Sequence, residues 1–147
     1  MTQTTIVLAT DFSQEAQRAY GPTVDMAERL GGKIVLAHVV EAALISPHGA
    51  PLAPAQVAPD TPQRVDEAEE QLKKEAQLLG DRVPVEVKAS SHETCAEGLV
   101  RLADGVGATH IAISTHGRTG LRRLVLGSVA EGVVRYATVP VICYPAH

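Results

Sequence analysis

Aromatic residues are nearly absent from this chain: its 147 residues include one Phe, three Tyr and no Trp. The hydrophobic content is nevertheless 45%, and most of it comes from Ala, Val, Leu and Ile. An aliphatic core of this kind suits helices packed on a parallel sheet better than two sheets packed face to face. The composition therefore favours the α/β class.

Other shortages exclude further classes of protein. Cys95 and Cys143 are the only cysteines, too few for a disulfide framework, and they indicate a reducing compartment. No signal peptide precedes the first predicted strand, and no apolar run approaches the roughly 18 residues of a membrane span. The net charge of −4 gives no electrostatic footprint for nucleic acid. We therefore expect a cytoplasmic protein that binds neither membrane nor nucleic acid.

The length fits a single domain over residues 1–147, in which apolar runs alternate with amphipathic segments. This alternation predicts a three-layer, open, parallel five-stranded sheet with helices on both faces, a Rossmann-like α/β fold. Pro84 argues for an edge position for the third strand. The predicted strands are residues 4–9, 33–40, 83–87, 110–113 and 138–145.

Capping signals place the helices between these strands. Ser13 is a candidate N-cap for a helix that reaches residue 30, with a kink expected near Gly21 and Pro22. Thr61, followed by a proline, is a candidate N-cap for a second helix, which ends at a glycine, Gly80. Residues 94–97 match a capping box that begins a third helix.

Residues 41–61 break the pattern, because prolines recur there among glycine and several alanines. We expect neither a regular helix nor a ladder strand in this segment. It is interpreted as a mobile surface excursion, and the alternative, a lid or a segment that docks a partner, stays open.

The stretch between the strand at 110–113 and a predicted helix at 129–136 is typical of an anion-binding loop. Glycines let the backbone approach a phosphate, and the N–H groups at a helix start favour negative charge. Ser128, as N-cap or first-turn residue, offers a hydroxyl donor. Charge-assisted donors are available from Arg118, Arg122 and Arg123.

The glycine spacing resembles that of the universal stress protein family, whose nucleotide-binding members carry G-x2-G-x9-G-S/T. Gly117 corresponds to the second glycine, and Gly127 with Ser128 to the closing pair, whereas Ser114 replaces the first glycine. Residues 9–13 and 36–39 also resemble the ends of the family's first two strands. The resemblance spans nearly the whole chain, and it implies an ATP-binding protein. Mg²⁺ can accompany ATP, since phosphates supply most of its ligands.

The resemblance implies that Asp11 and Val39 lie near adenine and ribose, and that Gly127, Ser128 and Val129 donate to the phosphates. Asp11 has the alternative role of helping to cap the first helix, although Ser13 already serves as the cap. The complete predicted site is Ala9, Thr10, Asp11, Val39, Ile113, Ser114, His116, Gly117, Arg118, Gly120, Gly127, Ser128 and Val129.

Ser114 leaves two alternatives open. If the position requires a left-handed backbone, serine there costs roughly 1–2 kcal/mol; if glycine only avoids crowding the ribose, serine is a mild replacement. The histidines lack metal-ligand spacing, so no transition-metal site is expected. No catalytic base is evident in the loop.

The implied function is an ATP-binding, nucleotide-dependent regulatory module of the stress response, whose protein partner the sequence does not identify. A slow ATPase or self-phosphorylating protein, and a nucleotide-free dimeric scaffold, remain alternatives. The last strand is apolar on both faces and contains Pro140, which predicts a sheet edge that needs covering. We expect a homodimer formed through residues 139–144.

Overall fold

The computed structural model describes residues 2–46, 52–115 and 126–145. Five strands form one parallel sheet in the order β5-β2-β1-β6-β7, which confirms the predicted fold class. The strands are β1 (Thr5–Ala9), β2 (Lys33–Glu41), β5 (Val85–His92), β6 (His110–Ser114) and β7 (Val141–Tyr144). The strand with the preceding proline, β5, lies at an edge as predicted.

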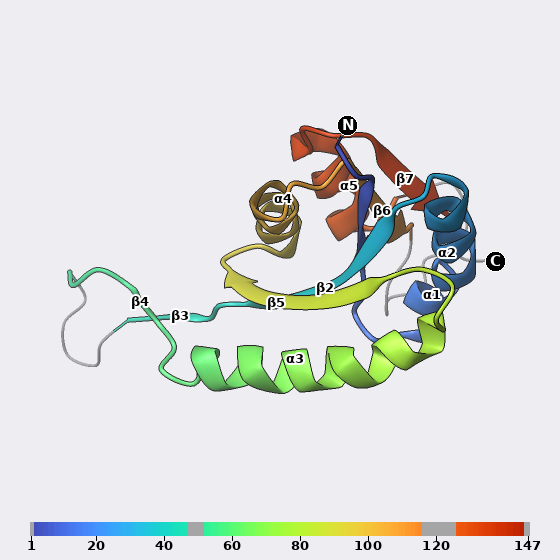
Figure 1. Ribbon diagram of the computed structural model, residues 1–147. Coiled ribbons are helices and arrows are strands. Elements are labelled where there is room, and N and C mark those ends of the chain that lie inside the picture. Colours follow the sequence, from blue (N-terminus) through green and yellow to red (C-terminus); the bar gives the residue numbers. More distant parts are fainter. Residues whose placement is uncertain (1, 47–51, 116–125, 146–147) are drawn as a thin grey trace.

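The sheet is covered on both faces by helices (Figure 1). They are α1 (Gln14–Gln17), α2 (Tyr20–Arg29), α3 (Thr61–Ala76) with the 3₁₀ turn η1 (Gln77–Leu79), α4 (Cys95–Gly105) and α5 (Ser128–Tyr136). Alternate residues of each central strand enter opposite cores. Ile6, Leu8 and Leu36 pack with α2 and α3, whereas Val7 and Val35 pack with α4 and α5. Strands apolar on both faces therefore form the middle layer.

Two glycines set how closely α4 approaches its neighbours. A Cβ on Gly98 would lie 2.7 Å from Val39 Cγ1, so only glycine lets α4 lie this close to the end of β2. A Cβ on Gly132 would lie 2.5 Å from the Cβ of Ala96, which brings α5 against α4. These contacts place the starts of α4 and α5 beside the carboxyl ends of the strands.

The first helical segment differs from the prediction. The interruption lies at Arg18 and Ala19, between α1 and α2, and not at Gly21 and Pro22. Pro22 lies in the first turn of α2, where N–H groups make no bond within the helix, so the proline breaks no hydrogen bond there. Ser13 caps α1 as predicted, since its Oγ accepts from the N–H of Ala16 at 3.1 Å.

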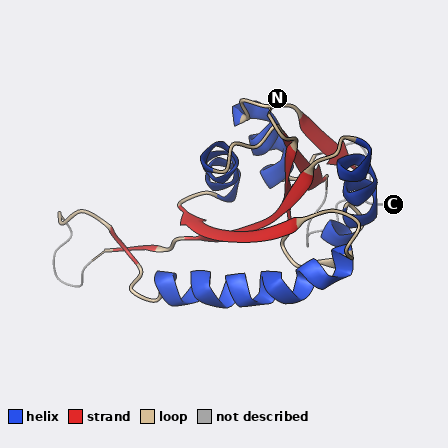
Figure 2. Cartoon of the chain, in the orientation of Figure 1, coloured by secondary structure: helices blue, strands red, loops and turns tan. Residues whose placement is uncertain are grey.

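Three other local features also differ from the prediction. The segment 41–61 contains a short antiparallel ladder, β3 (Leu44–Ile45) with β4 (Gln56–Val57), which projects from the body (Figure 2), so the prediction of no ladder strand was wrong. The N-cap of α3 is Asp60, and the predicted N-cap, Thr61, is the first residue of the helix. Thr94 is the N-cap of α4, but its side chain makes no capping bond, so the predicted capping box is not formed.

The ends of the last two elements shift by a few residues. Pro140 precedes β7 instead of lying inside it, although β7 is an edge strand as predicted. Ser128 is the first residue of α5, and Gly127 is its N-cap. Within the described ranges, no helix combines the length and apolar character needed to cross a membrane.

Candidate functional site

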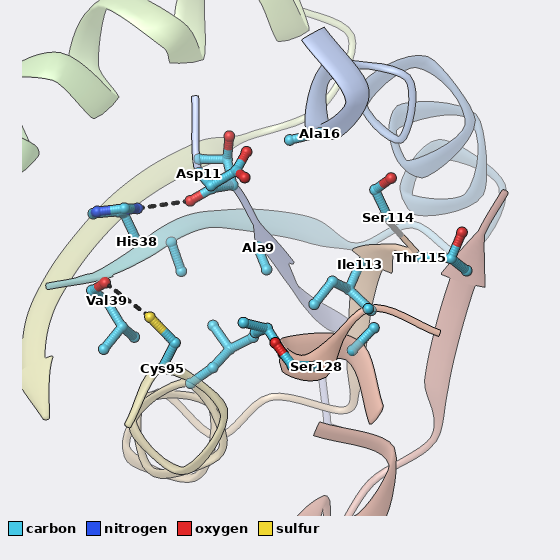
Figure 3. A pocket seen from close by; sticks show the side chains of 16 residues that line it. Ala9, Asp11, Ala16, His38, Val39, Cys95, Ile113, Ser114, Thr115 and Ser128 are labelled. Atoms are coloured by element: carbon cyan, nitrogen blue, oxygen red, sulfur yellow. Dashed lines mark hydrogen bonds between the residues drawn. The ribbon is translucent and has the colours of Figure 1, made fainter. Parts of the chain in front are cut away.

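A pocket of about 270 Å³ lies at the carboxyl ends of β1, β2 and β6. The strand that follows β1 in the chain, β2, lies on one side of β1, and the later strand β6 lies on its other side. The strand order therefore reverses at β1, which makes the pocket the topological switch point of the sheet. In Figure 3 the labelled side chains surround one hollow, with Asp11 and Ser128 on opposite sides. Segments from the two halves of the chain thus converge on one site.

Every described residue of the predicted site lines this pocket. The set is Ala9, Thr10, Asp11, Val39, Ile113, Ser114, Gly127, Ser128 and Val129. The four others, His116, Gly117, Arg118 and Gly120, lie outside the described residues, as do Arg122 and Arg123. The structure therefore brings the strand-end and helix-start parts of the prediction together, while their role in binding stays a prediction.

Asp11 both lines the pocket and orders the turn after β1. Its Oδ1 accepts a hydrogen bond from the Ser13 N–H at 3.0 Å and another from the Ser13 hydroxyl. The same Ser13 oxygen then accepts from the N–H of Ala16 at the start of α1. The helix-capping alternative for Asp11 is therefore correct in an indirect form, and it coexists with the pocket position.

Phe12 has a left-handed backbone, with φ of 66°, and among the described residues no other non-glycine residue has a positive φ. Such a conformation costs roughly 1–2 kcal/mol for an L-residue. Two contacts hold the turn: the Phe12 N–H donates to Thr10 Oγ1 at 3.0 Å, and the ring packs against His38 with centroids 4.7 Å apart. The turn that presents Asp11 is thus strained and externally supported.

Ser114 is the last residue of β6, pairs with Tyr144 and is 8% exposed. It is not among the residues with positive φ, so a left-handed backbone is excluded at this position. Of the two alternatives for the replaced glycine, only crowding by a Cβ and hydroxyl remains. The serine therefore carries no backbone cost.

The N-terminus of α5 opens onto the pocket, and its first three residues, Ser128, Val129 and Ala130, all line it. The N-cap residue, Gly127, has no side chain with which to cap this helix, and its N–H donates to the Thr115 carbonyl at 2.7 Å. The first-turn N–H groups of a helix have no intrahelical acceptor. This end of the pocket therefore offers backbone donors and the positive end of the helix dipole to an anion.

Several pocket residues were missed by the sequence analysis: Ala16, Ala37, His38, Cys95, Leu99, Thr115 and Ala130. His38 and Thr115 lie at strand ends, so the rule that ligands bind at the carboxyl ends of parallel strands could have identified them. Ala16, Cys95, Leu99 and Ala130 come from helices, and their position depends on packing that no local pattern announces.

His38 and Cys95 line the wall next to β2. His38 Nδ1 lies 2.8 Å from the Thr10 carbonyl oxygen, and because a carbonyl only accepts, this nitrogen donates its proton. The Cys95 thiol donates to the Val39 carbonyl at 3.5 Å. Burial, reinforced by the Glu41 carboxylate, raises the pKa of Cys95 to about 12. Cys95 therefore keeps its proton at physiological pH and serves as a hydrogen-bond donor.

No group of three or more His, Cys, Asp or Glu within the described residues is placed to hold a metal ion. Asp11 is the carboxylate that lines the pocket. The described walls thus combine apolar side chains and hydroxyls with one carboxylate, one imidazole, one thiol and backbone donors.

The fold and the pocket together define the class of open-sheet α/β proteins with a pocket at the topological switch point, the place where ligands bind on such sheets. The sequence model of the Universal stress protein family matches residues 3–145. The chain belongs to the universal stress protein family.

Relatives and solved structures agree with this membership. A universal stress protein of Methanocaldococcus jannaschii is 29% identical over 140 residues, which cover 93% of this chain and 79% of that protein. A universal stress protein structure from Archaeoglobus fulgidus superposes with a TM-score of 0.70 at 23% identity, covering 97% and 94% of the two chains. An Archaeoglobus fulgidus structure in complex with dAMP gives 0.66 at 22% identity, covering 97% of each chain. At this identity the structures show the shared fold.

Proposed function

We propose that this universal stress protein binds an adenine nucleotide, with ATP as the expected ligand, in the pocket between β1, β2, β6 and α5. The observation that carries the proposal is the convergence of all the described predicted residues on one pocket at the start of α5, whose N-cap is a glycine. A relative of known structure binds dAMP, and another universal stress protein structure, 20% identical, is a complex with cAMP. Both ligands are adenine nucleotides.

The donor set of the pocket fits a nucleotide in two regions. The start of α5 and the Ser128 hydroxyl offer donors suited to phosphate oxygens. On the opposite side Asp11 offers a carboxylate acceptor suited to ribose hydroxyls. Ala9, Ala37 and Val39 also line the pocket, and their apolar side chains suit the faces of a flat base. Mg²⁺, where it accompanies ATP, would take most of its ligands from phosphate and water.

The bound nucleotide is expected to act as a regulatory signal, because Asp11 and His38, the candidate bases of the described lining, lie away from Ser128, where the phosphates are expected. Calorimetric titration with ATP, ADP, AMP and adenosine tests this function. Affinity should fall as phosphates are removed, and phosphate release should remain at background. Turnover well above background would favour the ATPase alternative, and no binding of any of the four ligands would favour the scaffold.

Ser114→Gly is expected to change the dissociation constant of ATP by less than about tenfold. The serine has no left-handed strain to relieve, so only a Cβ and a hydroxyl are removed from the pocket wall. The measurement is the same titration on both proteins. A gain of a hundredfold or more would mean that Ser114 blocks the site in the natural sequence.

We also propose that β7 forms the contact of a homodimer. The N–H groups of Ile111 and Thr115 donate to the carbonyls of Pro140 and Tyr144, and alternate residues of a strand direct their backbone groups to opposite sides. The N–H groups of Val141 and Cys143 are therefore directed to the open edge. Antiparallel pairing with a second copy would satisfy them.

Cys143→Pro should convert this dimer to a monomer, because proline removes an N–H at the open edge and leaves the bonds to β6 in place. Cys143→Ala, which keeps the N–H, serves as the control and should remain dimeric. Light scattering at micromolar concentration measures the mass of each protein. A monomeric mass for the natural sequence would refute the dimer itself.

A further inference from the structure

Tyr20 is a buried polar residue beside the pocket that does not line it. Its side chain is 4% exposed and comes from the first turn of α2. The phenol oxygen lies 2.7 Å from Thr10 Oγ1 and 2.7 Å from Glu75 Oε2 on α3. Tyr20 thus joins a residue of the pocket wall to a helix that contributes no residue to the described pocket lining.

The direction of each hydrogen bond in this group follows from donor chemistry. A carboxylate only accepts, so the Tyr20 hydroxyl donates to Glu75 and must accept from the Thr10 hydroxyl. The Thr10 oxygen in turn accepts from the Phe12 N–H at 3.0 Å. The result is a chain of hydrogen bonds from Phe12 through Thr10 and Tyr20 to Glu75, all polarised in one direction, and such chains strengthen cooperatively.

The chain ends at the strained part of the pocket. Phe12 has the left-handed backbone, and the turn around it presents the Asp11 carboxylate. The Phe12 amide is the first donor of the chain, so the turn is tied to α3 by way of Tyr20. Without this anchor, the Thr10 hydroxyl would lose the acceptor that holds its side chain in place, and the Phe12 N–H bond that offsets the strain would lose that support.

The ionisation of Tyr20 is consistent with this role. Burial raises the pKa of its hydroxyl above the ordinary value; the bond from Thr10 opposes the increase, and the Glu75 carboxylate adds to it. The hydroxyl therefore keeps its proton, and with it the bond to Glu75, over the physiological pH range.

We propose that Tyr20 and Glu75 are positioning residues, which hold the Asp11–Phe12 turn in the conformation that the nucleotide pocket requires. This inference rests on the proposed function for its effect on binding. It assigns a role in binding to two residues that do not line the pocket. Glu75 is the more distant of the two, since it reaches the pocket wall only through Tyr20.

Two readouts on three variants and one control variant test the proposal. The first readout is hydrogen exchange of the Phe12 and Ser13 amides, followed by NMR on the protein without nucleotide. In Tyr20→Phe and in Glu75→Leu these amides should exchange at least about tenfold faster, because the turn opens locally. Glu75→Gln, whose amide oxygen still accepts from Tyr20, should keep exchange near that of the natural protein.

The second readout is ATP affinity. Tyr20→Phe and Glu75→Leu should weaken it about tenfold, the scale of one lost hydrogen bond, and Glu75→Gln should stay within about threefold. Val24→Ala is the control for general loss of stability: Val24 is 3% exposed on the same helix and does not line the pocket. In this control, the exchange rates of the Phe12 and Ser13 amides and the ATP affinity should stay unchanged.

The outcomes separate the two proposals. Unchanged exchange of the Phe12 and Ser13 amides in Tyr20→Phe overturns the positioning role, whatever the protein binds. Faster exchange with unchanged ATP affinity also overturns it. If the natural protein binds no nucleotide, the proposed function fails, and the exchange data alone then decide whether the turn is anchored through Tyr20.

Discussion

Ser128→Glu should weaken ATP binding by about a hundredfold or more while leaving the protein folded. The new carboxylate would stand at the start of α5 and in the pocket wall, where the phosphates are expected. Two like charges about 4 Å apart near a protein surface repel by roughly 4 kcal/mol, and each 1.4 kcal/mol corresponds to a tenfold change in affinity.

This substitution separates binding from stability because its two effects have opposite signs. An acidic residue in the first turn of a helix favours the helix dipole, by about 0.3–1 kcal/mol, so urea unfolding should show equal or higher stability. Val134→Glu adds the same charge to an exposed position of the same helix, 48% exposed and away from the pocket lining. It should retain nucleotide affinity. Equal losses in the two variants would indicate a general charge effect and contradict the assigned phosphate position.

Leu36→Ala should lower the free energy of unfolding by about 3 kcal/mol. Leu36 is fully buried on β2, beside Leu8 of β1 and Val87 of β5, and its side chain enters the core shared with α2 and α3. Truncation removes buried methyl groups and leaves a cavity in a sheet that cannot relax freely. The melting temperature should fall by roughly 10 °C for a chain of this size.

Leu78→Ala is the matched control for this prediction. Leu78 lies in η1 with 60% of its side chain exposed, so the same truncation should cost less than about 0.5 kcal/mol. Urea denaturation of the three proteins, with equal slopes, gives both differences. A small effect at Leu36, comparable to that at Leu78, would mean that β2 is not the packed centre of the sheet.

The main architecture could be predicted because the strands are apolar on both faces, a pattern that central parallel strands require. Thr5–Ala9 and Lys33–Glu41 show this pattern, and their flanking helices carry recognisable start signals such as Ser13. The order of the strands was not predicted, because no local pattern states which strands pair. The short β3 and β4 ladder was missed since the prolines around it obscured a pairing of two residues per strand.

For the site, the strand-end and helix-start residues could be predicted because their chemistry is local: a carboxylate after β1 and a Gly-Ser pair before α5. The support for the Asp11–Phe12 turn could not. Tyr20 and Glu75 are 55 positions apart, and each alone resembles an ordinary helix residue. Only the tertiary fold brings Glu75 to Tyr20 and Tyr20 to Thr10. Likewise, the interruption at Arg18 and Ala19 was misplaced because proline in a first turn is tolerated.

The most direct test of nucleotide binding is to denature the freshly purified protein and to identify any released nucleotide by chromatography. We expect an adenine nucleotide, ATP above all, in an amount approaching that of the protein. We also expect its amount to fall sharply in Ser128→Glu and to persist in Val134→Glu. A protein that releases no nucleotide and then fails to bind added ATP would contradict the account and leave the nucleotide-free scaffold as the function.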